Sequence, residues 1–384
     1  MTEEAGAAAV QGRHGGNGAW IGDDDTVLGS VDGTGLLLVA PGTGTVAALG
    51  PEDRNAAVDV GARTLAAAGV GTGDRVVVAL NNEGAQAGTL LTEAAVAAGA
   101  SAAAIGPRGR MRLHGALEVV GATTLVATTT GAMDLLSRLH LEFGLDPLDL
   151  GLRRILLAGE IAVPGARRQL AEEFDAEVID LLMDPRFQIP LARGVEGTLV
   201  PTVAGTVGLA PLTEDRPVPP PYPGGAAEIT THPVWHSELS STTVRTGLVA
   251  VPGPGATAIP LPQHTVGDRV LVRGQWLSLA RLERALAPID GIAHWTLHVS
   301  RPGTLDTATL RVVFARASLV ENPMWRGRIE QALAGLTPVR IDLVIEPHID
   351  DERRPGTVAD DRGHHLARTR AEAEGHHHAD LPHP

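Results

Sequence analysis

The strongest constraint on the fold is a regular alternation of strand-like and helix-like segments between residues 35 and 182. Short continuous apolar runs predict strands buried on both faces, which is typical of parallel sheets. The segments between them carry apolar residues at helical spacing. The expected strands are 35–40, 75–80, 102–105, 124–127, 154–158 and 177–182, and the expected helices are 51–68, 85–98, 111–120, 132–143 and 165–174. This order predicts a doubly wound α/β layer.

Two further patterns follow along the chain. From about residue 195, short β-like pieces alternate with proline clusters, of which 217–223 (PVPPPYP) is expected to be an exposed loop. After residue 268 the pattern predicts a small α+β module in the order β-α-β-β-α-β. Its expected elements are strand 270–273, helix 279–286, strands 295–299 and 309–315, helix 322–333 and strand 339–345.

These patterns divide the chain into four parts. Residues 1–33 are rich in Gly and Asp and are expected to be a flexible N-terminal segment. A large domain is expected over 34–266 and a small C-terminal domain over 267–362. Residues 363–384, with GHH and GHHH, are expected to form a disordered, His-rich tail that takes up metal ions only adventitiously.

The charged residues are unusual, because all 31 cations are arginine and the chain has no lysine. A lysine Schiff base and a P-loop lysine are therefore excluded. With no cysteine, disulfides, a thiolate nucleophile and Cys-ligated zinc are excluded as well. A net charge of −14 argues against nucleic acid and anionic membranes as partners. With no long apolar stretch and an acidic, Gly-rich start, a cytoplasmic protein is expected.

Ordered segments of the chain resemble the phenylacetate–coenzyme A ligases of the acyl-adenylate-forming (ANL) superfamily. They are 65–80 (LAAAGVGTGDRVVVAL), 120–129 (VGATTLVATT), 145–174, 244–247 (VRTG), 267–274 (GDRVLVRG) and 357–365 (TVADDRGHH). The resemblance covers about residues 37 to 368 and implies an adenylate-forming-enzyme fold, truncated at the N-terminus. It also implies a hinge at Asp268, about which the family rotates its small domain.

The positions that handle ATP in that family differ here. Its phosphate loop, SSGTTGKP, corresponds to a shortened loop containing Gly42, Thr43, Gly44 and Thr45, without the lysine. Its magnesium-binding glutamate falls at Arg186 and its ribose-binding aspartate at Leu248, whereas the preceding arginine is kept as Arg245. Its terminal catalytic lysine falls at His364. Since such groups each contribute roughly 10²–10³ in rate, we expect no ATP or magnesium cofactor.

Candidate catalytic residues are Glu160, Arg186 and His236. Glu160 follows an expected strand, at the edge where open α/β sheets place their sites, although it also suits the N-terminus of a helix beginning near Pro164. Arg186 is expected either to project into the former nucleotide cleft or to lie at the surface. The segment THPVWHSEL contains His232 and His236 at metal-like spacing, but no helix is expected there and no metal is assigned.

Three functions fit these observations. The favoured one is a repurposed protein that binds an aromatic or polyketide-like acyl substrate, free or CoA- or carrier-bound, and catalyses cyclisation, condensation or rearrangement without ATP. The others are a non-catalytic partner of an active homologue and an atypical ATP-dependent ligase. A homodimer or a heterodimer with a homologue remains open. With adenylation lost, the two domains are expected to hold one orientation.

Overall fold

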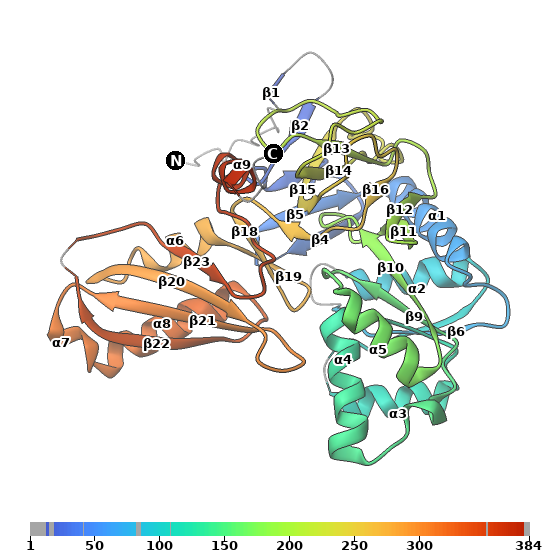
Figure 1. The fold of residues 1–384 in the computed structure, drawn as a ribbon, viewed down its shortest axis with the longest axis horizontal. Helices are drawn as coiled ribbons and strands as arrows, with labels where there is room; N and C mark the ends of the chain where they lie inside the picture. Colours follow the sequence, from blue (N-terminus) through green and yellow to red (C-terminus); the bar gives the residue numbers. More distant parts are fainter. Residues whose placement is uncertain are drawn as a thin grey trace.

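The computed structural model describes residues 13–14, 19–40, 42–81, 86–107, 109–350 and 352–379 of the chain. Figure 1 shows a large domain and a smaller one beside it. Among the described residues, no helix is long and apolar enough to cross a membrane.

The central sheet of the large domain has eight strands in the order β16-β12-β11-β10-β9-β8-β6-β7. Its parallel half confirms the predicted α/β layer from strand 75–80 onward, since β7, β6, β8, β9 and β10 all run in the same direction. The expected strand 35–40 does not belong to this layer, because it forms β4 (Leu36–Ala40) in a separate sheet, where its pairing is antiparallel, and is partly exposed. The other half is antiparallel. The strands are β6 (Arg75–Val78), β7 (Ser101–Ala104), β8 (Thr124–Ala127), β9 (Arg154–Ala158), β10 (Glu177–Met183), β11 (Pro190–Val195), β12 (Thr198–Pro201) and β16 (Ile259–Pro260).

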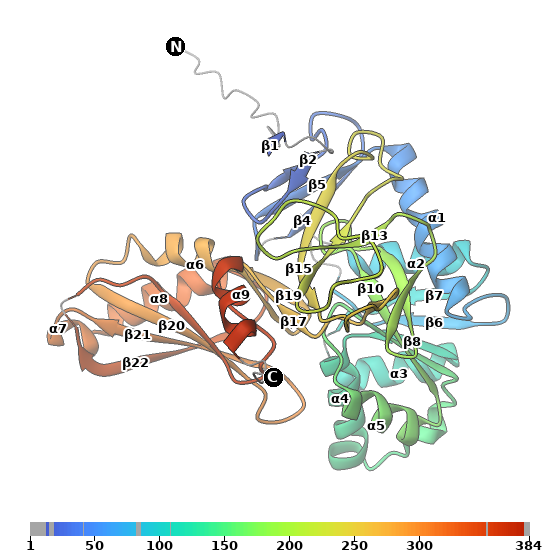
Figure 2. The same ribbon diagram turned by 45° about the horizontal axis from the view of Figure 1, so that its top comes forward.

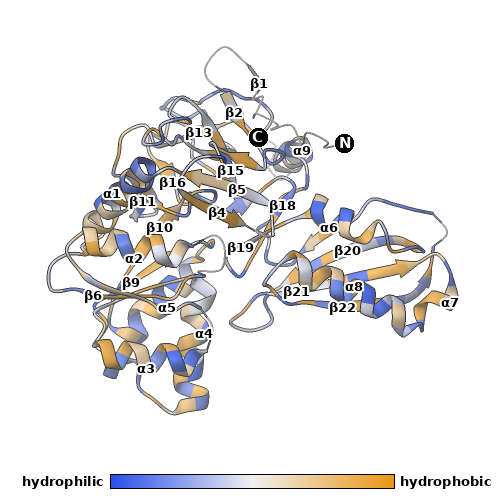
Figure 3. Ribbon diagram, turned by 180° about the vertical axis from the view of Figure 1, so that it is seen from behind, coloured by the Kyte–Doolittle hydropathy of each residue, from blue (hydrophilic) through white to orange (hydrophobic). Residues whose placement is uncertain are grey.

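Helices cover both faces of this sheet, as the continuous apolar runs predict. Val76 and Val78 pack toward α1 (Pro51–Ala67) and α2 (Ala87–Ala97), whereas Val77 packs in the opposite core. That second core includes α3 (Arg110–Val120), α4 (Thr129–Arg138) and α5 (Pro164–Phe174). Figure 3 shows hydrophobic residues on the strands and many hydrophilic ones on the outer helix α1.

Helix α4 differs from the predicted helix 132–143. It begins earlier because Thr128 caps it, accepting a hydrogen bond at Oγ1 from the backbone N–H of Gly131 at 3.0 Å. It also ends earlier, and Leu139–Phe143 continue as a π-helix. A 3₁₀ turn, Pro147–Leu150, then leads toward β9. The early start places Thr128 and Thr130 at the carboxyl ends of the parallel strands.

Two further sheets complete the large domain. One has the order β1-β2-β15-β14-β13, with β17 also paired to β15, and the other has the order β3-β5-β4. The strands of the first are β1 (Arg13–His14), β2 (Ala19–Ile21), β13 (Val207–Ala210), β14 (Ala227–Thr231), β15 (Thr243–Ala250) and β17 (His264–Thr265). Those of the second are β3 (Val27–Leu28), β4 (Leu36–Ala40) and β5 (Thr45–Leu49).

The expected flexible segment 1–33 needs correction over its described part. Trp20 and Ile21 are buried in β2, which runs parallel to β15, and Leu28 is buried in β3. These few large apolar residues anchor a stretch whose Gly and Asp content favours flexibility. Residues 1–12 and 15–18 lie outside the described part.

The small domain is a four-stranded sheet, in the order β22-β21-β20-β23, covered by helices. The hairpin β18 (Arg269–Val272) and β19 (Gln275–Ser278) precedes it and shares its apolar core. The remaining elements are α6 (Leu279–Leu286), β20 (Ile292–Ser300), β21 (Thr307–Phe314), α7 (Ala317–Val320), α8 (Pro323–Leu336), β22 (Ile341–Ile349) and β23 (Thr357–Asp360).

The expected disordered tail 363–384 also needs correction. Residues up to 379 are described, and they end in helix α9 (Arg370–Ala379). Ala373 of this helix is fully buried against the large domain, in a cluster with Leu212, Val249 and Val266. Figure 2 shows α9 at the junction of the two domains. Residues 380–384 lie outside the described part.

Candidate functional site

The carboxyl ends of the parallel strands face the hairpin of the small domain. Thr128 follows β8, Gly159 and Glu160 follow β9, and the turn of the hairpin lies against them. At the turn, Gly274 has φ +70°, and a Cβ there would lie 2.8 Å from Thr128 Cγ2 and 3.6 Å from the Gly159 carbonyl oxygen. The two domains therefore meet at the edge where open α/β sheets place their ligands.

This close approach makes Gly274 sensitive to substitution. Gly274→Ala is expected to lower the free energy of unfolding by about 1–2 kcal/mol from the left-handed backbone alone, with a further cost from the overlap of its Cβ with Thr128. Gly303→Ala is the matched control, because no atom lies within 4 Å of a Cβ there. Chemical denaturation of both variants measures the effect, and equal midpoints would contradict this packing.

Glu160 is held by the first turn of α4 rather than by the helix that begins at Pro164. Its Oε2 accepts a hydrogen bond from the backbone N–H of Thr130 at 2.7 Å, and its Oε1 accepts one from Thr130 Oγ1, also at 2.7 Å. Burial, with a smaller contribution from Asp306 of the small domain, raises the pKa of Glu160 to about 7. At neutral pH this carboxyl is poised to give or take a proton.

The raised pKa makes stability depend on pH. The native protein binds a proton at Glu160 more tightly than the unfolded chain, in which the group titrates near 4.5. The stability from this group is complete below about pH 4.5 and is lost as the pH rises to about 7, by about 3 kcal/mol at most. Glu160→Gln is expected to remove this loss, so that its stability relative to the native protein rises between pH 5 and pH 8. Urea unfolding at several pH values tests this, and a constant difference would contradict it.

The loop of residues 42–45, which the sequence resemblance aligns with a phosphate loop, is closed on itself. The backbone N–H groups of Thr43 and Gly44 both donate to the Ala40 carbonyl oxygen, at 3.2 and 2.7 Å. The Thr43 and Thr45 hydroxyls lie 2.8 Å apart and share a hydrogen bond. These two N–H groups are therefore engaged within the loop and do not form an anion nest.

The small domain also covers this loop. The Gly42 carbonyl oxygen accepts a hydrogen bond from the backbone N–H of Ser278 at 3.0 Å, and a Cβ at Gly42 would lie 2.2 Å from the carbonyl oxygen of Trp276. Gly44 is approached by the guanidinium of Arg281, which would overlap a Cβ there. The loop thus makes a contact between the domains, at the position that the sequence resemblance aligns with the phosphate loop.

Arg186 is buried beside that loop, with 5% of its surface exposed. Its guanidinium donates to the carbonyl oxygens of Gly22, at 2.6 Å, and Asp25, at 3.1 Å, and to Thr45 Oγ1 at 3.3 Å. Burial, together with the nearby Arg269, lowers its pKa to about 9. These contacts tie the segment before β3 to the loop.

His236 is buried beside β5, with 2% of its surface exposed, and its ring lies 5.4 Å from that of Phe187. Its Nε2 is 3.0 Å from the Ala48 carbonyl oxygen, and its Nδ1 accepts from the backbone N–H of Glu238 at 3.2 Å. Both ring nitrogens are thus engaged. Among the described residues, no group of three or more His, Asp or Glu side chains is arranged to hold a metal ion.

The other positions taken from the resemblance are distributed around the domain junction. Leu248 on β15 lines the same cavity as Glu160. Arg245, also on β15, is paired with Glu228 at 2.6 Å and Asp215 at 2.9 Å and lines a different cleft. His364 lies beside Thr265, whose backbone N–H donates to its carbonyl oxygen at 2.6 Å, and burial and Arg362 lower its pKa to about 4.

The space at the junction is divided unequally. Two inner cavities, each of about 60 Å³, lie beside Glu160 and beside the Gly42–Thr43 loop, and Trp276 lines both. A larger cleft of about 710 Å³ opens between the domains. It shares Asn81, Thr128 and Gln275 with the second inner cavity. Sequence reasoning missed Thr130, Gln275 and Trp276, since only the fold brings the hairpin against the strand ends.

Comparison with known proteins agrees with this architecture. No protein-family model and no curated protein matches the chain. A solved structure of 2-hydroxyisobutyryl-CoA ligase, with 2-HIB-AMP and CoA in the thioesterification state, has a TM-score of 0.68 at 20% identity and covers 83% of this chain and 71% of its own.

Two more similar structures extend the comparison. A double mutant of o-succinylbenzoate CoA synthetase from Bacillus subtilis has a TM-score of 0.58 at 12% identity, over 85% of this chain and 69% of its own. An amide bond synthetase from Marinactinospora thermotolerans has a TM-score of 0.57 at 16% identity, and the match covers 85% of this chain and 64% of the synthetase. The chain therefore has the adenylate-forming-enzyme fold that its sequence resemblance implies.

Proposed function

We propose that this protein binds an acyl thioester in the cleft between its domains and acts on the acyl group without ATP. The observation that carries the proposal is the contrast between the small inner cavities beside the 42–45 loop and Glu160 and the open cleft between the domains. Small-molecule sites usually have volumes of about 300–1,000 Å³. The cleft of about 710 Å³ falls in this range, whereas inner cavities of about 60 Å³ do not.

The cleft has the chemistry to hold a phosphate-bearing thioester such as a CoA ester. Arginines line it from both domains, namely Arg110, Arg138, Arg273 and Arg340. Arg110 and Arg138 are paired with Asp134, whereas Arg340 is 85% exposed and, among the described residues, forms an ion pair only with the exposed Asp342. Guanidinium groups bind phosphate oxygens through charge-assisted hydrogen bonds.

Glu160 is the group we assign to the chemistry. In this proposal the thioester lies along Asn81, Thr128 and Gln275, and its acyl end reaches the inner cavities beside Gly159 and Glu160. A carboxylate with a pKa of about 7 can remove a proton from the carbon next to a thioester carbonyl and return it elsewhere. That proton transfer begins a cyclisation, condensation or rearrangement. Arg186 and His236 line neither the cleft nor the inner cavities, so this proposal gives them no part in the proton transfer.

Binding of phenylacetyl-CoA, measured by calorimetry, tests the proposal. We expect binding that weakens with salt, and Arg340→Ala is expected to weaken it about 3–10-fold, as for one exposed phosphate contact. The control Arg63→Ala changes an exposed arginine of α1 in an ion pair with Asp59 and is expected to leave affinity unchanged. No heat of binding, or equal losses in both variants, would contradict the proposal.

A non-catalytic partner of an active homologue is the second candidate, and the small inner cavities favour it. Such a protein would not need Glu160 to ionise. If the native protein and Glu160→Gln support a homologue's activity equally, and neither alters a bound thioester, the partner function replaces the catalytic one.

A further inference from the structure

The hinge between the domains is crossed twice by the chain. The crossing segment (residues 265–269) leads from β17 into β18. The return segment (residues 363–375) follows β23 and runs back to the large domain beside the crossing segment. The backbone N–H of Thr265 donates to the His364 carbonyl oxygen at 2.6 Å, and that of Leu366 donates to the Thr265 carbonyl oxygen at 2.9 Å. The backbone N–H of Gly267 donates to the Ala367 carbonyl oxygen at 3.1 Å. The two crossings therefore form a short parallel pair.

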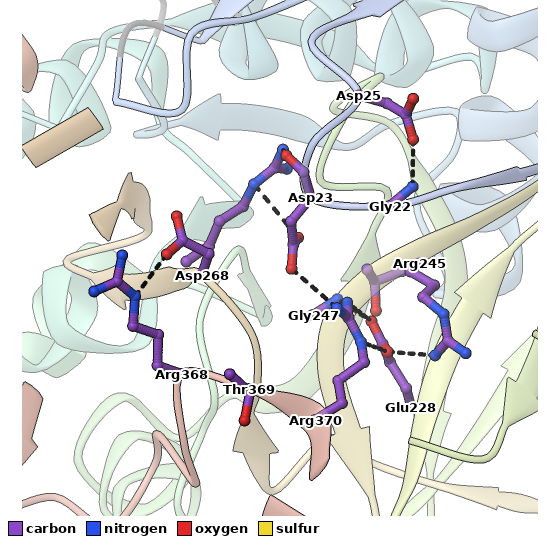
Figure 4. Close-up of polar contacts among 12 residues, drawn as sticks. Gly22, Asp23, Asp25, Glu228, Arg245, Gly247, Asp268, Arg368, Thr369 and Arg370 are labelled. Atoms are coloured by element: carbon purple, nitrogen blue, oxygen red, sulfur yellow. Dashed lines mark hydrogen bonds and ion pairs between the residues drawn. The ribbon is translucent and has the colours of Figure 1, made fainter. Parts of the chain in front are cut away.

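Side chains of the return segment attach it to both domains, as Figure 4 shows in part. Arg368 donates to Asp268 Oδ1 at the hinge, at 2.9 Å, and to Glu283 Oε2 of α6 in the small domain, at 2.7 Å. Two residues later, Arg370 donates to both carboxylate oxygens of Glu228, on β14 of the large domain, at 2.7 and 3.0 Å.

The large-domain anchor is buried. Glu228 has no exposed surface and also accepts hydrogen bonds from Arg245 and from the backbone N–H of Gly247. Asp23 lies 3.2 Å from Arg370, and these two carboxylates raise the pKa of that arginine. Beyond it, the methyl group of Ala373 is fully buried against Leu212 and Val249. A buried, bidentate pair of this kind is costly to separate.

We infer that the return segment is a clamp that fixes the orientation of the two domains. A domain hinge works when a few residues absorb the change in φ and ψ. Here a rotation about Asp268 would break the bonds between the paired crossings, and would also separate Arg368 from Glu283 or Arg370 from Glu228. The inference is independent of the proposed function, since it requires no particular ligand in the cleft.

Distance measurements between the domains test the clamp. The chain has no cysteine, so Gln169→Cys on α5 and Gln331→Cys on α8, both exposed, give two unique sites for spin labels. We expect one narrow distance distribution, unchanged by Mg·ATP or phenylacetyl-CoA. In the same background, Arg368→Ala with Arg370→Ala is expected to broaden it or add a second distance, whereas Arg63→Ala is not.

Two distances in the labelled protein with Arg368 and Arg370 intact would overturn the inference. A single, unchanged distance in a folded Arg368→Ala, Arg370→Ala variant would overturn it as well. If the double variant does not fold, amide hydrogen exchange of the native protein tests the clamp instead. The N–H groups of Thr265, Leu366 and Gly267 are expected to exchange at least about 100-fold more slowly than in an unstructured peptide. Exchange at the unstructured rate would overturn the clamp.

Discussion

Glu160→Gln is expected to slow the exchange of the α protons of bound phenylacetyl-CoA with solvent deuterium by at least about 100-fold. These protons are acidified by the thioester carbonyl and the ring, and glutamine cannot accept one. In the native protein the exchange rate should rise with pH through about 7, as Glu160 ionises. Nuclear magnetic resonance of the thioester in heavy water measures both effects, and calorimetry shows whether the variant still binds.

The matched control for this prediction is Glu173→Gln. Glu173 lies on α5, has 42% of its side chain exposed, and contacts only His140 as an ion-pair partner among the described residues. Its substitution is expected to leave exchange unchanged. Equal exchange rates for the native protein and Glu160→Gln would show that another group, or none, removes the proton.

Glu228→Ala is expected to lower the free energy of unfolding by about 3 kcal/mol. The substitution removes a fully buried carboxylate and leaves Arg245, which is 5% exposed, and Arg370 with less compensation for their charge. Urea unfolding measures the change. Glu330→Ala is the control, because its i,i+4 pair with Arg326 is exposed and contributes about 0.5 kcal/mol or less. Similar losses in both variants would contradict the burial of this network.

The parallel half of the large domain could be predicted from sequence because its strands are continuous apolar runs. Strands buried on both faces, such as β8 and β9, leave short apolar runs that amphipathic helices and half-exposed strands do not share. The adenylate-forming fold followed from ordered motifs and is confirmed by the solved structures that the chain resembles.

The return segment could not be predicted, because its attachment depends on charge pairs rather than on apolar periodicity. Arg368 and Arg370 read as surface residues of a solvated tail, and their partners Asp268 and Glu228 lie about a hundred residues or more earlier in the chain. The same limit applies to Trp20, whose burial depends on a distant strand. Only the folded chain brings such residues together.

The candidate site was predicted only in part. The position of Glu160 at a strand end was readable, but its hydrogen bonds to Thr130 depend on where α4 begins. The loop that lacks a lysine is covered by the small domain, whose residues approach Gly42 and Gly44. The roles of Arg186, Leu248 and His364 as substitutes for ATP-handling groups stay predictions.

The most direct test of the central claim is a calorimetric titration of the intact protein with Mg·ATP, beside one with phenylacetyl-CoA, at the same pH and salt concentration. We predict clear binding of the thioester and no measurable heat of binding for Mg·ATP. The N–H groups of Thr43 and Gly44 are already hydrogen-bonded within the loop, and the cavity beside them has a volume of only about 60 Å³. Saturable Mg·ATP binding, accompanied by carboxylate-dependent release of pyrophosphate, would contradict this prediction and identify the protein as an ATP-dependent ligase.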